Sequence, residues 1–171
     1  QLQFGVTVFM EKPLNRFMGA GGTGIRMADF DADVFDHSNV GFIRGGVIGA
    51  TITGTQPIST FGELPRSMKM PRWGSAWKKA SIEWYDRVAN IGSSGEHIPY
   101  AGNYFDLDTT YKNPAGDPLL RMTINWRDNE RKIVEFMNAK MVEIGRAMGA
   151  KEVNPFPGYG QYDVTRYQST H

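Results

Sequence analysis

The stretch from Asp128 to Gly149 constrains the fold most strongly, because its apolar side chains recur at helical spacing along one face. Asp128 can cap the start of a helix, Glu130 suits its first turn, and Gly149 can adopt the left-handed conformation that ends many helices. The apolar positions of this face are Ile133, Phe136, Met137, Met141, Ile144 and Met148. We interpret the methionine-rich face as core packing rather than as a cofactor site.

Four further stretches have the composition of β-strands. They are Gln3–Met10, Val40–Thr53, His97–Leu107 and Leu119–Trp126. The last two flank a polar turn that contains Pro and Gly, so we expect them to form an antiparallel pair with a long loop.

A second helix is predicted from Trp77, with Gly92 placed to end it. The Pro- and Gly-rich stretches 54–72 and 149–161 are predicted to be surface loops. Strands and helices do not alternate regularly along the chain. The sequence therefore predicts an α+β fold, with an antiparallel β-sheet backed by helices, in a single domain over residues 1–171.

Composition excludes several classes of function. The net charge of +1 gives no overall field that would attract nucleic acid or anionic lipid. The chain has no cysteine, which excludes disulfides, thiol nucleophiles and cysteine metal sites. No apolar run approaches the ~20 residues of a membrane-spanning helix, so we expect no direct membrane span. The basic stretch from Arg66 to Arg87 is interpreted as a solvated helix face, with a docking patch for an acidic partner as the alternative.

Two motifs match binding signatures only in part. Gly19-Ala-Gly-Gly-Thr-Gly24 has the spacing of a dinucleotide-binding loop, but no helical pattern follows it, so we interpret it as a flexible glycine loop. Asp29-Phe-Asp31-Ala-Asp33 resembles the start of a calcium-binding loop. The glycine and glutamate that such a loop requires later are absent, so we interpret it as a carboxylate-rich turn.

The three histidines show no metal-ligand spacing, and we predict no metal site. His37 is expected to be exposed in a turn, and His97 is expected to open a strand in a structural role. His171 ends the chain after a polar and aromatic run-in, and the chain begins without Met in a strand pattern. We therefore expect a piece of a longer protein. His171 taken alone would be a polar terminal residue.

The order of motifs in the chain resembles that of the glucose-methanol-choline (GMC) oxidoreductases. The stretches that carry the resemblance are Asn103-Tyr-Phe-Asp-Leu-Asp108, Tyr111-Lys-Asn-Pro-Ala-Gly-Asp-Pro118, the strand Leu120–Ile124, the helix Asp128–Gly149 and the run-in Tyr167-Gln-Ser-Thr-His171. The first half is similar to the subgroup that contains bacterial gluconate 2-dehydrogenase flavoproteins and their sorbitol, fructose and alcohol dehydrogenase relatives, notably at 30–37, 41–49 and 71–78.

This resemblance implies the substrate-binding domain of an FAD-dependent dehydrogenase that oxidises a CH–OH group of a polyol, sugar or sugar acid. His171 would be the catalytic base, and flavin would accept the hydride. The family's FAD-binding glycine fingerprint is absent from the sequence, so we expect the isolated chain to bind no FAD tightly and to be inactive. The sheet would roof the flavin, and Gly45, Gly46 and Gly49 would allow close approach.

The same resemblance implies partners and a location. Electrons would pass to a cytochrome c subunit or a quinone-linked acceptor, a small subunit would accompany the flavoprotein, and the site would lie at the periplasmic face. Two alternatives remain at this point. One is a non-catalytic carbohydrate- or partner-binding α+β module, and the other is hydride transfer to NAD at Gly19–Gly24.

Overall fold

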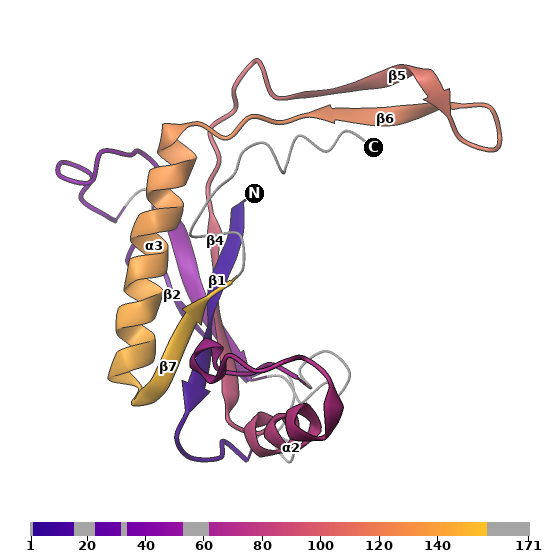
Figure 1. The fold of residues 1–171 in the computed structure, drawn as a ribbon. Coiled ribbons are helices and arrows are strands. Elements are labelled where there is room, and N and C mark those ends of the chain that lie inside the picture. Colours follow the sequence, from indigo (N-terminus) through magenta and orange to yellow (C-terminus); the bar gives the residue numbers. More distant parts are fainter. Residues whose placement is uncertain (1, 16–22, 32–33, 53–61, 157–171) are drawn as a thin grey trace.

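The computed structural model describes residues 2–15, 23–31, 34–52 and 62–156, and it confirms the predicted α+β class. Five strands form an antiparallel sheet in the order β2-β3-β4-β1-β7. Their bounds are Leu2–Met10 for β1, Thr23–Met27 for β2, Gly46–Ile52 for β3, Val88–Gly95 for β4 and Ala150–Pro155 for β7. The helix α3, Asp128–Ala147, lies along one face of this sheet, and α2, Gly74–Trp84, lies beyond its end (Figure 1). A short 3-10 turn, η2, spans Arg66–Met68.

The long helix packs as its apolar face predicts. Ile133, Met137 and Met141 are fully buried, and they join Val6 and Val8 of β1 in one hydrophobic cluster. Gly145 lets the helix approach the sheet closely, because a Cβ there would lie 2.8 Å from Cγ2 of Val153. The predicted stripe is less complete at its end, where Met148 is 45% exposed.

Both ends of α3 follow from local chemistry. Gly149 has a φ of 83°, which confirms the predicted left-handed C-terminal position. At the start, Arg127 rather than Asp128 occupies the cap position. The reason is that the Glu130 carboxylate accepts a hydrogen bond of 3.1 Å from the Arg127 backbone N–H, which satisfies the donor one residue earlier than predicted.

The predicted second helix is too long. The helix α2 ends at Trp84, and the residues from Val88 onward form β4, the central strand of the sheet. Helical spacing of Trp84, Val88 and Ile91 suggested one continuous helix. In the fold, β4 gains backbone hydrogen bonds to strands on both of its edges, and Ile91 is buried in the core. Tertiary pairing therefore overrides a weak local pattern.

Three other strand predictions change. The strand in 40–53 begins only at Gly46. The strand β2 was not predicted, and residues 150–155 form the edge strand β7 where a surface loop was expected. Both are short edge strands beside glycine-rich sequence, which carry little alternating pattern of their own.

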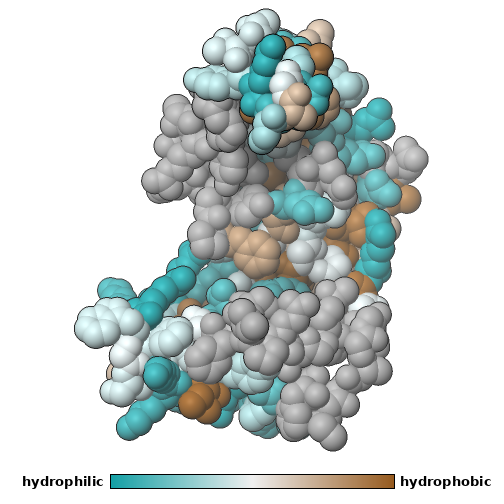
Figure 2. All heavy atoms as spheres, turned by 90° about the vertical axis from the view of Figure 1, so that its right-hand side faces the viewer, coloured by the Kyte–Doolittle hydropathy of each residue, from teal (hydrophilic) through white to brown (hydrophobic). Residues whose placement is uncertain are grey.

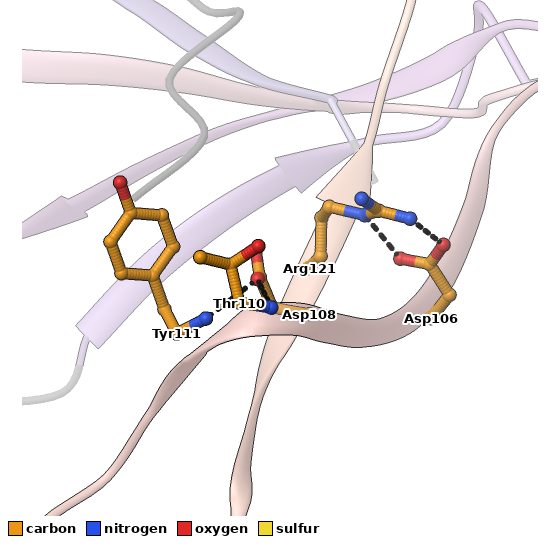
Figure 3. A network of polar contacts seen from close by, with 5 residues as sticks. All are labelled: Asp106, Asp108, Thr110, Tyr111 and Arg121. Atoms are coloured by element: carbon orange, nitrogen blue, oxygen red, sulfur yellow. Dashed lines mark hydrogen bonds and ion pairs between the residues drawn. The ribbon is translucent and has the colours of Figure 1, made fainter.

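The antiparallel pair in the second half of the chain is confirmed with different bounds. The strands β5, Tyr104–Lys112, and β6, Pro118–Thr123, form a hairpin that reaches away from the sheet (Figure 1). The loop is shorter than predicted, because the Asp108 carboxylate accepts hydrogen bonds of 2.8 and 2.9 Å from the N–H groups of Thr110 and Tyr111 (Figure 3). A bulge forms there, and the strand continues beyond it. Arg121 pairs with Asp106 across the hairpin (Figure 3).

Within the described ranges, no helix is long and apolar enough to cross a membrane. No group of three or more potential metal-ligating side chains comes together in those ranges either.

Candidate functional site

The two faces of the five-stranded sheet differ sharply in composition. Val6, Ile48 and Ile91 point toward α3 and belong to the core. Side chains alternate along a strand, so the residues between them point to the opposite side, which we call the open face. The open face carries small or polar residues at its centre, among them Gln3, Gly5, Gly49, Asn90, Gly92 and Ser94.

The strand register places three glycines of the open face in one line. Gly49 of β3 pairs with Gly92 of β4, and Gly92 pairs with Gly5 of β1. We call these three residues the glycine row. Since neighbouring strands lie about 4.8 Å apart, the row forms a strip of backbone about 10 Å long across the middle of the sheet.

The fold itself does not require glycine at two members of the row. Among the described residues, a Cβ on Gly92 would meet only the carbonyl oxygen of Phe4, at 3.8 Å, and a Cβ on Gly49 only that of Ile25, at 3.4 Å. Neither residue has a positive φ. A strand glycine with an ordinary conformation and free space above it is typical of a place where a ligand or another backbone approaches.

The third glycine is explained by this chain. A Cβ on Gly5 would lie 2.6 Å from the carbonyl oxygen of Ile91 and 2.8 Å from Cε2 of Phe156. The Phe156 ring therefore lies over Gly5, and its backbone N–H donates a 2.9 Å hydrogen bond to the Gly5 carbonyl. The strip is thus bounded by an aromatic ring at its β1 end.

A hollow of about 670 Å³ lies over this face. Its lining includes Gly24, Gly49, Gly92, Val47 and Phe156, and its polar lining side chains include Gln3, Arg26, Asn90 and Ser94. Among the described residues of this lining, Arg26 alone has an ionisable side chain. The arrangement suits a flat, hydroxyl-bearing molecule, because the floor lacks side chains and donors and acceptors stand around it.

Two known proteins are similar to this chain over most of its length, although no protein-family model matches it. The chain is 43% identical over 159 residues to the gluconate 2-dehydrogenase flavoprotein of Pantoea cypripedii, an alignment that covers 92% of the chain and 25% of that protein. The chain is homologous to part of a GMC-family dehydrogenase. It is also 27% identical to the 2-methyl-1,2-propanediol dehydrogenase of Mycolicibacterium austroafricanum, over 76% of the chain and 25% of that protein. The chain spans about a quarter of the length of both relatives.

The GMC homology makes the position of each predicted site residue relevant. The catalytic base expected from the resemblance, His171, lies outside the described residues. Residues 19–22 of the Gly19–Gly24 motif do too, but its last two residues, Thr23 and Gly24, begin β2. A strand therefore follows the motif where a dinucleotide-binding loop would need a helix, which agrees with its interpretation as a non-nucleotide loop.

The three glycines that were expected to allow close approach of flavin, Gly45, Gly46 and Gly49, differ in what surrounds them. A Cβ on Gly45 would lie 1.9 Å from the carbonyl oxygen of Phe30, and a Cβ on Gly46 would lie 2.7 Å from that of Ser94. Both glycines thus serve the close packing of this chain's own backbone. Gly49 alone of the three lines the hollow.

Two histidines differ from expectation. His37 is not an exposed turn residue, because its ring packs edge-on against Phe35 and Phe42, with centroids 5.2 and 5.7 Å away. Both of its ring nitrogens are buried without a hydrogen-bond partner. His97 does not open a strand, but it is structural as predicted: it packs on Trp126, 4.9 Å between centroids, and contacts the Asn103 side chain.

A buried carboxylate that the sequence did not single out for this role holds the base of the hairpin. Glu130, 1% exposed, accepts hydrogen bonds of 3.2 Å from the Ile98 N–H and from the Tyr100 hydroxyl, besides the Arg127 N–H described above. Burial and the nearby Glu130 charge raise the pKa of Tyr100. The Asn103 side chain ties the two hairpin stems together through the Asn125 backbone, with Oδ1 accepting a 2.7 Å hydrogen bond from its N–H.

Proposed function

We propose that this chain is the substrate-binding part of an FAD-dependent GMC dehydrogenase that oxidises a CH–OH group of a polyol, sugar or sugar acid. We further propose that residues 1–171 form one such domain of a longer polypeptide, which we call the full-length flavoprotein. The observation that carries the proposal is the glycine row, because Gly49 and Gly92 leave space that the described residues do not fill. The homology to a flavoprotein supplies the chemical class of what would fill it.

The residues of the open face fit one wall of a flavin site. A planar ring system can lie parallel to a strip of backbone that carries no Cβ, with an extended substrate between the ring and Gly49 and Gly92. The described residues contain no parallel β-α-β unit that could hold a dinucleotide, because every strand pair is antiparallel. This chain would therefore cover the flavin and the substrate, and the rest of the full-length flavoprotein would hold the nucleotide part.

Alcohol oxidation requires two acceptors, one for a proton and one for a hydride. FAD, when bound, supplies hydride acceptance. His171 would accept the hydroxyl proton on an imidazole nitrogen as the C–H bond breaks and the C=O bond forms. A neutral imidazole with an unperturbed pKa of about 6.5 suits this role near neutral pH. Asn90 and Ser94 would hydrogen-bond the substrate hydroxyls from either side of Gly92.

The remaining elements of the proposal depend on the family resemblance. A cytochrome c subunit or a quinone-linked acceptor would reoxidise the flavin, a small subunit would accompany the flavoprotein, and the site would face the periplasm. A membrane fractionation of cells with an epitope-tagged full-length flavoprotein, with and without its cytochrome partner, would test the location and the assembly together.

The direct test of the proposed function uses the full-length flavoprotein. We expect the purified protein to show a stoichiometric flavin spectrum that is bleached by gluconate without oxygen. We expect His171→Ala to retain FAD and bind gluconate, but to slow the bleaching by about a hundredfold or more. A full-length protein without flavin would overturn the proposal and favour a non-catalytic binding module.

A further inference from the structure

The Arg26 side chain on β2 lies beside the β3 end of the glycine row. Arg26 pairs with Gly49 across β2 and β3, so its side chain lies on the open face in line with Gly49, Gly92 and Gly5. The strip therefore has a guanidinium at one end and the Phe156 ring at the other. Arg26 is exposed, and within the described part of the chain its side chain makes no hydrogen bond or ion pair.

This placement gives the hollow a definite electrostatic preference. No carboxylate is among the described residues that line it, so none of these residues offsets the positive charge of Arg26. A guanidinium presents a planar set of N–H donors that matches a carboxylate in a bidentate arrangement. A neutral polyol offers no such group.

We propose that Arg26 binds the carboxylate of a sugar-acid substrate and selects sugar acids over neutral polyols. The inference rests on the proposed function, because it names the substrate class of the same open face. The carboxylate would pair with Arg26 at β2, the carbon chain would lie on Gly49 and Gly92, and the hydroxyls would reach Asn90 and Ser94. The span of about 10 Å from Arg26 on β2 to Gly92 on β4 accommodates an extended six-carbon acid.

The test measures binding by calorimetry, so that it does not depend on turnover. The full-length flavoprotein is titrated with D-gluconate and with sorbitol, which has a hydroxymethyl group in place of the carboxylate. We expect Arg26→Gln to weaken gluconate binding between about tenfold and a hundredfold, as for the loss of a charged hydrogen-bonded pair, and to leave sorbitol binding unchanged. Arg26→Lys should fall between, because it keeps the charge and loses the bidentate geometry.

The matched control is Arg72→Gln, which removes an exposed arginine that does not line the hollow. Equal gluconate binding by Arg26→Gln and Arg72→Gln would overturn the proposal, and so would equal losses for gluconate and sorbitol. Flavin bleaching is recorded on the same samples. If gluconate binding depends on Arg26 but gluconate does not bleach the flavin, the proposed oxidation is contradicted and the carboxylate-binding site is still supported.

A second inference concerns the β5–β6 hairpin, which carries an uncovered apolar face. Cross-strand pairing places Phe105 beside Met122 and Leu107 beside Leu120, two residues apart on the same side. These four residues, which we call the hairpin patch, are 66%, 48%, 60% and 65% exposed, in that order. Figure 2 shows apolar side chains at the surface of this hairpin, seen end-on at the top. The strands β5 and β6 pack on each other, and neither packs extensively on any other described element.

The hairpin patch is small and rigidly presented. Four side chains exposed to this extent offer on the order of 400 Å² of surface. A stable interface with an independent partner needs roughly 800 Å² from each side. A covering segment in the same polypeptide needs less, because its effective concentration is high. The Glu130 and Asn103 hydrogen bonds hold the hairpin stems in place, so docking costs little additional order.

We infer that the hairpin patch docks on the remainder of the full-length flavoprotein, which also rests on the proposed function. Phe105→Ser and Leu120→Ser should leave the Tm of the 171-residue chain unchanged and lower that of the full-length flavoprotein by several degrees. Tyr104→Ser, on the opposite face of the hairpin, should change neither. The inference would be overturned if Phe105→Ser and Leu120→Ser changed the Tm of the 171-residue chain and of the full-length flavoprotein equally. It would also be overturned if the 171-residue chain formed dimers that these substitutions abolish.

Discussion

Gly49 and Gly92 face each other across β3 and β4, and the space above both is left open by the rest of the described chain. Glycine in a strand costs stability, because it loses more conformational freedom on folding than other residues and packs no side chain. Nothing in the local backbone compensates, since neither residue adopts a positive φ. The simplest physical reason for glycine at both positions is that another group has to approach the backbone there.

Gly92→Ala should therefore not destabilise the 171-residue chain. A Cβ there meets one oxygen at 3.8 Å, an ordinary contact. We expect the free energy of unfolding to stay the same or to rise by about 0.4–1 kcal/mol, because alanine restricts the unfolded chain. Urea denaturation measures this directly. A loss of more than about 1 kcal/mol would mean that the glycine is structural after all.

Gly5→Ala, one strand away, should have the opposite effect. Its Cβ would lie 2.6 Å from a carbonyl oxygen of the neighbouring strand and 2.8 Å from the Phe156 ring, so strand or ring must shift. We expect a loss of about 1–3 kcal/mol in the same denaturation experiment. Gly92→Ala is the matched control, because the two glycines are cross-strand partners. Equal stability of the two variants would refute the difference assigned here.

Glu130→Gln should loosen the base of the hairpin. The glutamine keeps the volume but turns one acceptor oxygen into a donor, which then faces the Ile98 N–H or the Tyr100 hydroxyl. Leaving a buried donor unsatisfied should lower the free energy of unfolding by about 1–3 kcal/mol. Glu135→Gln, exposed on the same helix, is the control. If the two variants unfold alike, the Glu130 contacts do not stabilise this junction.

Acid should weaken the hairpin through the Asp106–Arg121 pair. The hydrogen bond from Arg121 holds the pKa of Asp106 below its ordinary value of 3.8. A carboxylate whose pKa is lower in the folded state stabilises that state above the unfolded pKa, and this stabilisation is lost as the pH falls through the folded pKa. We expect hairpin amide NMR signals to lose dispersion below about pH 4. Arg121→Gln should remove that step, and an unchanged pH profile in the variant would argue against the pair as its cause.

The parts of the fold that were predicted correctly have strong local patterns. The apolar stripe of α3, its left-handed Gly149 and the alternation of β1 each depend on residues close in sequence. The strand β4 was misread because its central place depends on two partners that lie far away along the chain. The edge strands β2 and β7 were missed for the same reason.

The candidate site shows the same division more clearly. Gly49 belonged to a glycine-rich stretch that the sequence already suggested for close approach, whereas Gly92 was placed at a helix end. Only the strand register brings Gly92 and Gly5 into line with Gly49 and Arg26. The spacing of residues along the chain does not reveal how strands pair. Neither the glycine row nor the place of Arg26 beside it could therefore be predicted from the sequence.

We propose above all that Gly49 and Gly92 of the glycine row are kept clear for the reacting groups of a flavin dehydrogenase. The most direct measurement is the rate at which gluconate bleaches the flavin of the full-length flavoprotein in Gly92→Val, by stopped-flow absorbance without oxygen. We predict that Gly92→Val keeps the Tm of the wild type and is bleached at least about tenfold more slowly. The control variant Arg72→Gln should be bleached at the wild-type rate. A Gly92→Val protein that folds, holds flavin and is bleached as fast as wild type would contradict it.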